Sequence, residues 1–473
     1  MTTKRPPSLQ QPLPGSGLPS AGWLAAFFAI SVSYHAFFLR TFSHWWFEDD
    51  PTLFAFVKTI GNPATFFISP EALRGYGAGG SLVPFQAVSQ WIDSTIAYRS
   101  VAFAHWHNVV SLAVTLFLLF HVLRRFALSN RTALVLSLLW LCLPATIAVN
   151  EFLSTRHYLE GTAASLLAVA VAQNIAQGVV RENARMIALL CVTLACAMLF
   201  KEVFAITVPL FIAIYLHESG RNRAAIFSLL LIAPYIAYRY WVFGSGVRWG
   251  APFLGPGEYL HYLVRLPSVL AGNFGGHALV VFFAGMLIAF GRRQKKLGRI
   301  LAYAFLLLAS SLVVIYPVAY PVYHFGHEHG TWLRALHLLG SGLFLAGGIF
   351  FCHLQRRYVR ISIALVTAAV LVCGAVVTRN AWERLMLQAE REGKFYLAHP
   401  DRLIYSEVPA GFYLGGLQLL YDVPVRHYIL SSERTQPPKS ELERHQTIWR
   451  AVNGKFEQDP ELFAELQRNA SKP

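Results

Sequence analysis

Three consecutive carboxylates follow the first long apolar run of this sequence. Glu48, Asp49 and Asp50 come after a stretch of aromatic residues and directly before Pro51. Adjacent carboxylates raise each other's pKa, and a carboxylate is a common general base. We therefore expect a general base here, with Asp49 favoured, Asp50 second and Glu48 third. The alternative is an acidic cluster at a helix N-terminus before the proline, which the helix dipole favours.

Cationic side chains lie within or beside later apolar runs. Charges at membrane depth are costly, so they usually line a cavity or pair with one another. Arginine holds a phosphate through two parallel hydrogen bonds, and lysine holds it as a point charge. The candidates for a phosphate site are Arg156, Lys201 and Arg334. The alternative for each of them is a structural ion pair or a side chain that reaches to the membrane interface.

Four further residues are expected to support these groups. Glu202 directly follows Lys201 and should pair with it. His105 and His107 stand at the start of an apolar run and should shape a pocket beside the first outer loop. His337 lies near Arg334, early in a late apolar run.

A metal or cofactor is not expected. The loop that contains His324, His327, Glu328 and His329 has ligand residues, but their spacing matches no established metal motif. A divalent ion in that loop therefore stays an alternative only. The chain also lacks a P-loop, a glycine-rich dinucleotide fingerprint and a serine nucleophile elbow, which argues against an ATP-driven pump.

The composition is that of a membrane protein. The 473 residues are 55% hydrophobic and only 14% charged, whereas a soluble domain has about 25% charged residues. The net charge of +15 does not indicate nucleic-acid binding, because the arginines separate apolar runs instead of forming a basic groove. The five cysteines all lie in apolar runs and have no C-x-x-C spacing, so we expect neither disulfides nor a metal site from them.

Eleven apolar runs are long enough, or nearly so, to cross a hydrocarbon core that requires roughly 20 residues. The sequence therefore predicts an all-α, polytopic membrane protein of about eleven transmembrane helices. The expected spans are 22–40, 101–123, 132–149, 159–176, 186–200, 203–217, 224–243, 277–290, 300–319, 332–352 and 360–378.

The loop charges predict the orientation of these spans. With eleven spans, the arginine-rich loops fall on one side, which places the N-terminus in the cytoplasm and the C-terminus outside it. We expect a disordered N-terminus at 1–21, a transmembrane domain at 22–378 with a long outer loop at 41–100, and an extracytoplasmic C-terminal region at 379–473. Within that region, Leu403 to Leu430 alternates enough to indicate a few strands or a helix–strand unit.

Several segments together resemble the C-type integral-membrane glycosyltransferases, in particular the protein O-mannosyltransferases and their tetratricopeptide-linked relatives. The acids at 48–50 resemble the paired acids that the family carries after its first span. The likeness continues in order at Ala104-His105-Trp106-His107-Asn108, from Pro144 to Arg156, at Phe200-Lys201-Glu202 and at Arg334-Ala335-Leu336-His337-Leu338. It covers roughly residues 22–350, although Thr146 and Ala148 replace a family His and Glu, and no tetratricopeptide repeats follow.

This resemblance implies an enzyme, a hexosyltransferase that uses a polyprenyl-phosphate sugar donor and inverts the anomeric carbon. The acceptor, which could be a glycan, a lipid or a protein, would be glycosylated on the extracytoplasmic side of a bacterial inner membrane. A phosphate leaving group needs cations to stabilise its charge, and the acceptor hydroxyl needs a base. The predicted residues supply both.

Two other classes of protein would use similar buried charges. A transporter or flippase for a lipid-linked or anionic substrate should show internal repeats or helices broken by glycine or proline in matching halves, and the sequence has no such symmetry. A non-catalytic scaffold would not need acids and buried cations on the same side of the membrane.

Overall fold

The computed structural model describes residues 20–244, apart from 48, 77–80 and 127, and residues 357–470, apart from 407–410, 424–427, 431–438 and 453–454. Between these two parts it describes eleven scattered positions, among them His337 and Ser341. The expected disordered N-terminus, the histidine loop at 324–329 and Arg334 therefore lie outside the described residues.

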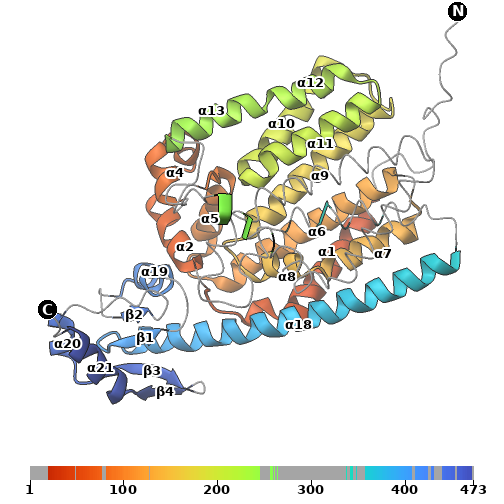
Figure 1. The fold of residues 1–473 in the computed structure, drawn as a ribbon. Coiled ribbons are helices and arrows are strands. Elements are labelled where there is room, and N and C mark those ends of the chain that lie inside the picture. The colour runs from red at the N-terminus through yellow and green to blue at the C-terminus, as the bar shows by residue number, and fades with distance from the viewer. Residues whose placement is uncertain are drawn as a thin grey trace, which may run out of the picture.

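A bundle of long helices forms the body of the molecule (Figure 1). Its members are α1 (Ala21–Ser33) with the π-helical turn Tyr34–Leu39, α6 (Val101–Arg125), α7 (Asn130–Leu141), α8 (Pro144–Glu151), α9 (Arg156–Ala176), α10 (Ala184–Phe200), α11 (Glu202–Glu218), α12 (Asn222–Leu230) and α13 (Ile232–Phe243). Ser100, Ser129 and Asn183 cap α6, α7 and α10 by accepting a backbone N–H of the first turn.

Helix α9 lies inside this bundle, between α6, α10 and α11. The approach of α9 to α11 depends on Gly161, because a β-carbon there would overlap the ring of Phe204. Small residues allow this kind of close helix packing where lipid gives no hydrophobic drive to association. The start of α9, which carries Arg156, is therefore held at a fixed place in the bundle.

The described residues contain five helices long and apolar enough to span a membrane, or six if the bent pair α7 and α8 is one span. The prediction of eleven spans is therefore not met. The third expected span bends by 64° before Pro144, whose ring cannot continue the preceding helix. The fifth and sixth become α10 and α11, of 17 residues each, which meet at the extended Lys201. The expected spans at 277–290, 300–319 and 332–352 lie wholly or largely outside the described residues.

Four short helices build the segment between α1 and α6, which is the predicted outer loop. They are α2 (Asp50–Thr59), α3 (Thr65–Ile68), α4 (Pro70–Tyr76) and α5 (Pro84–Ala97). They lie together at one end of the bundle, the same end at which the residues after 398 lie (Figure 1). The two segments that the charge rule placed on one side of the membrane are thus neighbours in space.

The C-terminal residues begin with α18 (Arg357–Ala398), whose 42 residues run along the side of the bundle. A small sheet follows, of β1 (Ile404–Ser406), β2 (Tyr428–Leu430), β3 (Trp449–Val452) and β4 (Lys455–Gln458), in the order β2-β1-β3-β4. Helix α19 (Gly411–Tyr421) connects the parallel strands β1 and β2, and α20 (Lys439–Arg444) and α21 (Pro460–Ala470) complete the unit. This confirms the helix–strand unit expected between 403 and 430.

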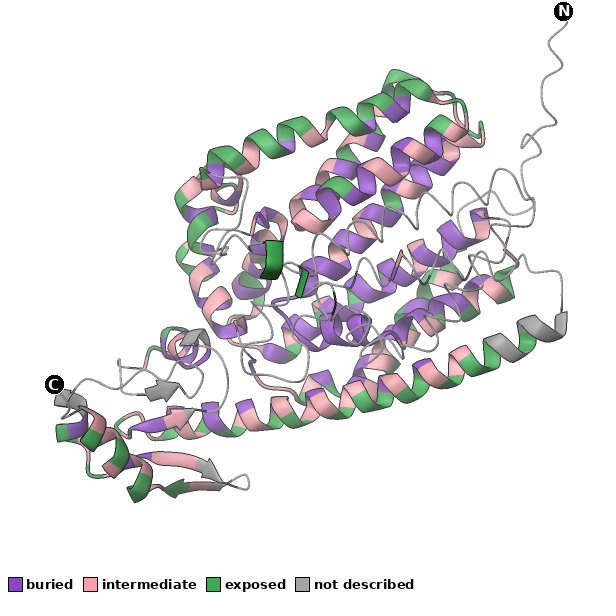
Figure 2. Ribbon diagram, viewed as in Figure 1, coloured by how far each residue is buried: buried purple, intermediate pink, exposed green. Residues whose placement is uncertain are grey.

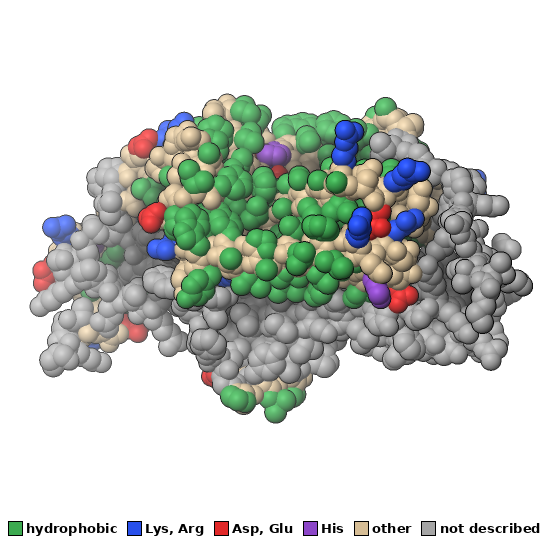
Figure 3. Space-filling model, turned by 90° about the horizontal axis from the view of Figure 1, so that it is seen from above, with side chains coloured by type: hydrophobic (Ala, Val, Ile, Leu, Met, Phe, Trp, Pro, Cys, Tyr) green, Lys and Arg blue, Asp and Glu red, His purple; other side chains and the backbone are tan. Residues whose placement is uncertain are grey.

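Burial separates the inner helices from those at the edge of the bundle. Helices α6, α8 and α9 are largely buried, whereas α12, α13 and residues 364–378 of α18 expose many side chains (Figure 2). The exposed side chains of α12 and α13 are mostly apolar, such as Ile226, Leu230 and Trp241. Figure 3 shows apolar side chains across the middle of this face and charged ones towards its ends, which is the distribution expected of a lipid-facing surface.

Candidate functional site

Two of the three predicted acids lie at the start of α2. Pro51 occupies the first helical turn, where its missing N–H costs nothing, so the helix begins at Asp50. Asp50 is 2% exposed, and its Oδ1 accepts the backbone N–H of Ser154 at 2.7 Å. Asp49 precedes it in a half-buried position. Glu48 lies outside the described residues.

The environment of Asp50 favours its neutral form. Burial raises the pKa of this carboxyl to about 7, the charge of Asp49 also raises it, and the hydrogen bond from Ser154 lowers it. Because a general base works best when its pKa lies near the working pH, the structure gives Asp50 a suitable pKa. The sequence placed Asp49 first, since nothing in a run of three acids tells which of them is buried.

Arg156, the first residue of α9, is almost completely enclosed by protein. The side chain is 1% exposed, and its three nitrogens contact groups on two other helices. Nε donates to Asn108 Oδ1 and Nη2 to the carbonyl oxygen of Ala104, both on α6, whereas Nη1 donates to Ser89 and contacts Asp93, both on α5. Protein groups therefore surround this guanidinium on all sides.

A second layer of charge lies around Arg156. The closest contact is the ion pair with Asp93, 2.5 Å from Nη1 to Oδ2. His107 lies 2.7 Å from the other oxygen of Asp93 through Nδ1 and 3.3 Å from Glu160 through Nε2. Ser89 donates to Glu160 at 2.9 Å. His107 thus takes part in a buried network that links α5, α6 and α9.

Asp93 was not found from the sequence, although a signal exists. Buried Gln86, Ser89, Gln90 and Asp93 recur at helical spacing along α5, whereas Ile92 and Ile96 are 39% and 64% exposed. Helices with one polar stripe usually turn it to water. In α5 the polar residues are buried and apolar residues are exposed. Such a pattern indicates a helix that turns its polar side towards the protein interior.

The second predicted cation, Lys201, lies between α10 and α11 in a different setting. Its ammonium donates to Ser81 at 2.7 Å, lies 3.5 Å from Glu202 and stands over the ring of Tyr158, 5.9 Å from its centroid. The expected pair of Lys201 and Glu202 is present. Arg239 of α13 reaches the other oxygen of Glu202 at 3.4 Å. Glu202 therefore contacts two cations.

Two further predicted residues, His105 and His337, have ring contacts of their own. His105 is buried, and its ring lies 6.1 Å from that of His44. His44 in turn is 3.2 Å from the buried carboxylate of Glu151 at the end of α8. His337 packs its ring against Trp140 of α7, 5.5 Å between centroids. The structure thus places His337 in the interior of the bundle, beside α7.

The junction between α8 and α9 joins the acid and the buried cation. Ser154 donates its N–H to Asp50, and its carbonyl oxygen accepts Gln86 Nε2 of α5 at 2.6 Å. Arg156 follows two residues later, and Tyr158, under the ammonium of Lys201, two residues after that. Residues 154–158 therefore connect Asp50, the Arg156 network and Lys201. Arg334 lies outside the described residues.

Among the described residues no group of three or more His, Cys, Asp or Glu side chains has a geometry that could hold a metal ion.

Comparison with known proteins adds no relative. No protein-family model matches the chain, and no curated protein matches it either. The resemblance to C-type glycosyltransferases therefore stays a prediction from the order of sequence motifs.

Proposed function

We propose that this protein is a membrane glycosyltransferase that moves a sugar from a polyprenyl-phosphate donor to an acceptor hydroxyl on the extracytoplasmic side. The observation that carries the proposal is Asp50. It is a buried carboxylate with a pKa of about 7, bonded to the loop before α9, at the end of the bundle where the outer-loop helices lie. A base of this kind suits the removal of a proton from a hydroxyl at neutral pH.

The reaction that fits these groups is a single inverting displacement. The acceptor oxygen forms a bond to the anomeric carbon while the bond from that carbon to the phosphate oxygen breaks. The hydroxyl proton goes to the carboxylate of Asp50, with Asp49 beside it at the half-buried edge. The lipid phosphate leaves with the electron pair of the broken bond.

The cations divide into two roles in this proposal. Lys201 and Arg239 bring two positive charges and Glu202 one negative charge, so this group favours an anion and suits the departing phosphate. Arg156 is surrounded by protein acceptors. We assign it the positioning of the α9 start. Of the three cations that the sequence suggested for the phosphate, Lys201 therefore keeps that role and Arg156 does not. Arg334 keeps its proposed phosphate contact.

A direct test uses the purified protein in lipid nanodiscs with a panel of polyprenyl-phosphate-linked hexoses and a membrane extract as the source of acceptor. The expected result is release of polyprenyl phosphate together with transfer of labelled sugar. Lys201→Gln should weaken donor binding, whereas Arg131→Gln, a change of an exposed arginine at the start of α7, should not. No release with any donor would contradict the proposal.

One observation favours a second candidate, a transporter or flippase for a lipid-linked substrate. The bend of 64° between α7 and α8 resembles the discontinuous helices that line transport sites. In that case, labelled donor would cross the bilayer of a sealed vesicle unchanged, and the transfer of sugar would not be observed.

A further inference from the structure

Helix α19 of the C-terminal region lies directly on the helix that carries the acids. A β-carbon added to Gly416 would overlap the backbone nitrogen and the hydroxyl of Thr52 and would lie 2.8 Å from its Cα. Real β-carbons essentially never come this close to other atoms, so only glycine fits here. Thr52 stands two residues after Asp50, in the first turn of α2. The helices touch backbone to backbone at this point.

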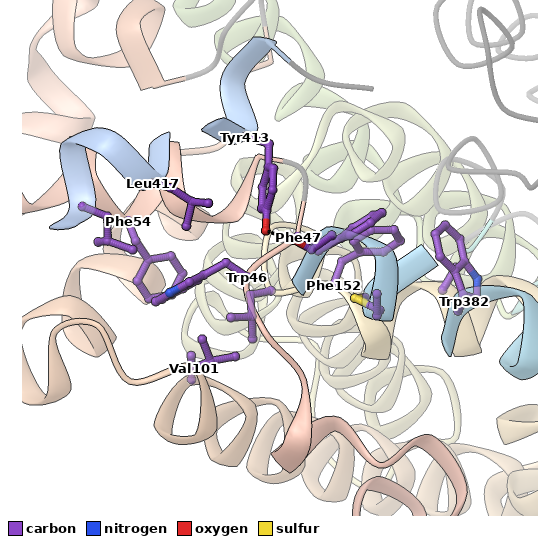
Figure 4. Close-up of a cluster of buried hydrophobic side chains, with 14 of the residues drawn as sticks. Trp46, Phe47, Phe54, Val101, Phe152, Trp382, Tyr413 and Leu417 are labelled. Carbon is purple, nitrogen blue, oxygen red and sulfur yellow. Dashed lines mark hydrogen bonds between the residues drawn. The ribbon is translucent and has the colours of Figure 1, made fainter. Parts of the chain in front are cut away.

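Apolar packing holds the two helices together over most of the length of α19. Leu414, Leu417 and Leu420 are fully buried, in the same core cluster as Trp46 and Phe54 of the outer loop. Figure 4 shows Leu417 beside Phe54 and Trp46, with Tyr413 between them and Phe47. Burial of these three leucines removes their side chains from water, so this contact is part of the fold and not a loose association.

Polar contacts at the C-terminal end of α19 fix its register. Tyr421 accepts Trp46 Nε1 at 3.0 Å, and the carbonyl oxygen of Leu420 accepts Arg99 Nε at 2.5 Å and the hydroxyl of Tyr98 at 3.2 Å. Arg99 also pairs with the carboxylate of Asp422. Residues near both ends of the outer loop, 46 and 98–99, therefore contact the last turn of α19 and the residue after it.

Helix α19 also contacts α18. Tyr413 donates its hydroxyl to the carbonyl oxygen of Ala389 at 2.6 Å. A β-carbon on Gly393 of α18 would lie 2.9 Å from Leu417 and would overlap the Tyr413 hydroxyl. Since α18 is one continuous helix from Arg357 to Ala398, α19 is wedged between a rigid helix and the acid-bearing α2.

We propose that α19 is part of the transfer site, and that Gly416 is a positioning residue which sets the place of α2 and therefore of the Asp50 carboxylate. This inference rests on the proposed function for its catalytic consequence, and on packing alone for its structural one. A methyl group at 416 must push α19 and α2 apart. Displacement of the α2 start would loosen the bond from Ser154 N–H to Asp50 and open the carboxyl to water.

The test compares Gly416→Ala and Gly416→Val with Gly374→Ala and Gly374→Val. Gly374 lies in α18 and has no atom within 4 Å of an added β-carbon, so it controls for the loss of glycine in a helix. The full-length protein in nanodiscs is used throughout. The first measurement, hydrogen exchange of the α2 amides, does not depend on activity.

We expect faster exchange in α2 for both Gly416 variants and none of this change for the Gly374 variants. Gly416→Ala should lower turnover by roughly 10²-fold, the cost of a misplacement of about 1 Å, with donor KM changed by less than about twofold, because the cations that hold the phosphate are elsewhere. The acid limb of its pH–rate profile should shift to lower pH than in the wild type, since water at Asp50 removes the burial that raises the pKa of this carboxyl. A general loss of structure would not move that profile.

Wild-type exchange in α2 and wild-type turnover in Gly416→Val would overturn this inference. If Gly416→Val does not fold, Gly416→Ala decides by the same measurements. If the wild type transfers no sugar, the proposed function fails, while the exchange of the α2 amides still decides whether Gly416 positions this helix.

Discussion

At the scale of single residues, Asp49 and Asp50 show how burial divides the roles of neighbouring carboxylates. Both are acids at the start of one helix, but only Asp50 is enclosed and bonded to Ser154. The sequence predicted that the acids, Lys201 and Arg156 lie on the same side of the membrane. It could not rank the two, because the enclosure of Asp50 comes from the loop after α8, far away in the chain.

The pKa of Asp50 leads to a prediction for the pH dependence of turnover. Burial raises it from 3.8 to about 7, so the base carries a proton at lower pH and becomes available as the pH rises through about 7. In a pH–rate profile at saturating donor, we expect the logarithm of turnover to rise with a slope of one below about pH 7. A profile that is flat between pH 5 and 8 would contradict the role of Asp50 as the base.

The same shift predicts an effect on stability with the opposite direction. Between pH 3.8 and about 7 the folded state binds the proton of Asp50 and the unfolded state does not, so the free energy of unfolding falls as the pH rises through this window. Asp50→Asn should remove that part of the decline. The measurement is SDS titration of the protein in mixed micelles at several pH values, and an unchanged decline would contradict the prediction.

Arg156 yields a prediction about stability. Replacement by Gln leaves the buried Asp93 without its guanidinium partner, and such a loss typically costs about 3–5 kcal/mol. Unfolding by SDS titration should therefore begin at markedly lower SDS for Arg156→Gln. Arg181→Gln, a change of an exposed arginine between α9 and α10, should stay within about 0.5 kcal/mol of the wild type. Equal stability of the two variants would show that Arg156 is not a structural cation.

At the scale of elements, the apolar periods predicted α1, α6 and α9 well, since each is one uninterrupted run with a capping residue or a helix break at its end. The bend between α7 and α8 follows from Pro144 and could have been anticipated. The inward polar face of α5 was missed because the segment at 41–100 was treated as a loop without elements. Its Gln86, Ser89 and Asp93 have partners in the loop before α9, on α9 and on α6, which a single sequence does not reveal.

In the loop before α2, His44 lies against the buried carboxylate of Glu151 on α8, and this contact gives a prediction for that element. His44 and Glu151 are 3.2 Å apart and 7% and 1% exposed. The substitutions His44→Gln and Glu151→Gln should be less costly together than the sum of the two, with a coupling of about 0.5–3 kcal/mol. The exposed pair Lys394 and Glu390 on α18 is the matched control, with a coupling of about 0.3–0.5 kcal/mol. Equal couplings would contradict the role of the pair.

At the scale of the whole molecule, the long α18 and the outer loop bring two distant parts of the chain to one end of the bundle. The sequence predicted both segments on the same side from loop charges, but treated the C-terminal region as a separate unit. Contacts between α19 and α2 depend on the fit of Gly416 against Thr52. No local pattern in either segment carries that information.

This arrangement predicts the accessibility of engineered cysteines in a background without the native ones. Thr95→Cys on α5 and Glu443→Cys on α20, both at exposed positions, should react with a membrane-impermeant maleimide added to intact cells. Arg223→Cys at the opposite end of the bundle, on α12, should react only after lysis. Reaction of Arg223→Cys together with the other two in intact cells would contradict the arrangement.

The central claim is that Asp50 accepts the proton of the acceptor during sugar transfer. The most direct measurement is single-turnover transfer at pH 8 and saturating polyprenyl-phosphate donor, for the wild type, Asp50→Asn and Asp401→Asn, an exposed acid of the C-terminal region. The account predicts a loss of roughly 10²–10⁴-fold for Asp50→Asn, with donor binding unchanged and Asp401→Asn equal to the wild type. Transfer by Asp50→Asn within a few fold of the wild type would contradict the account.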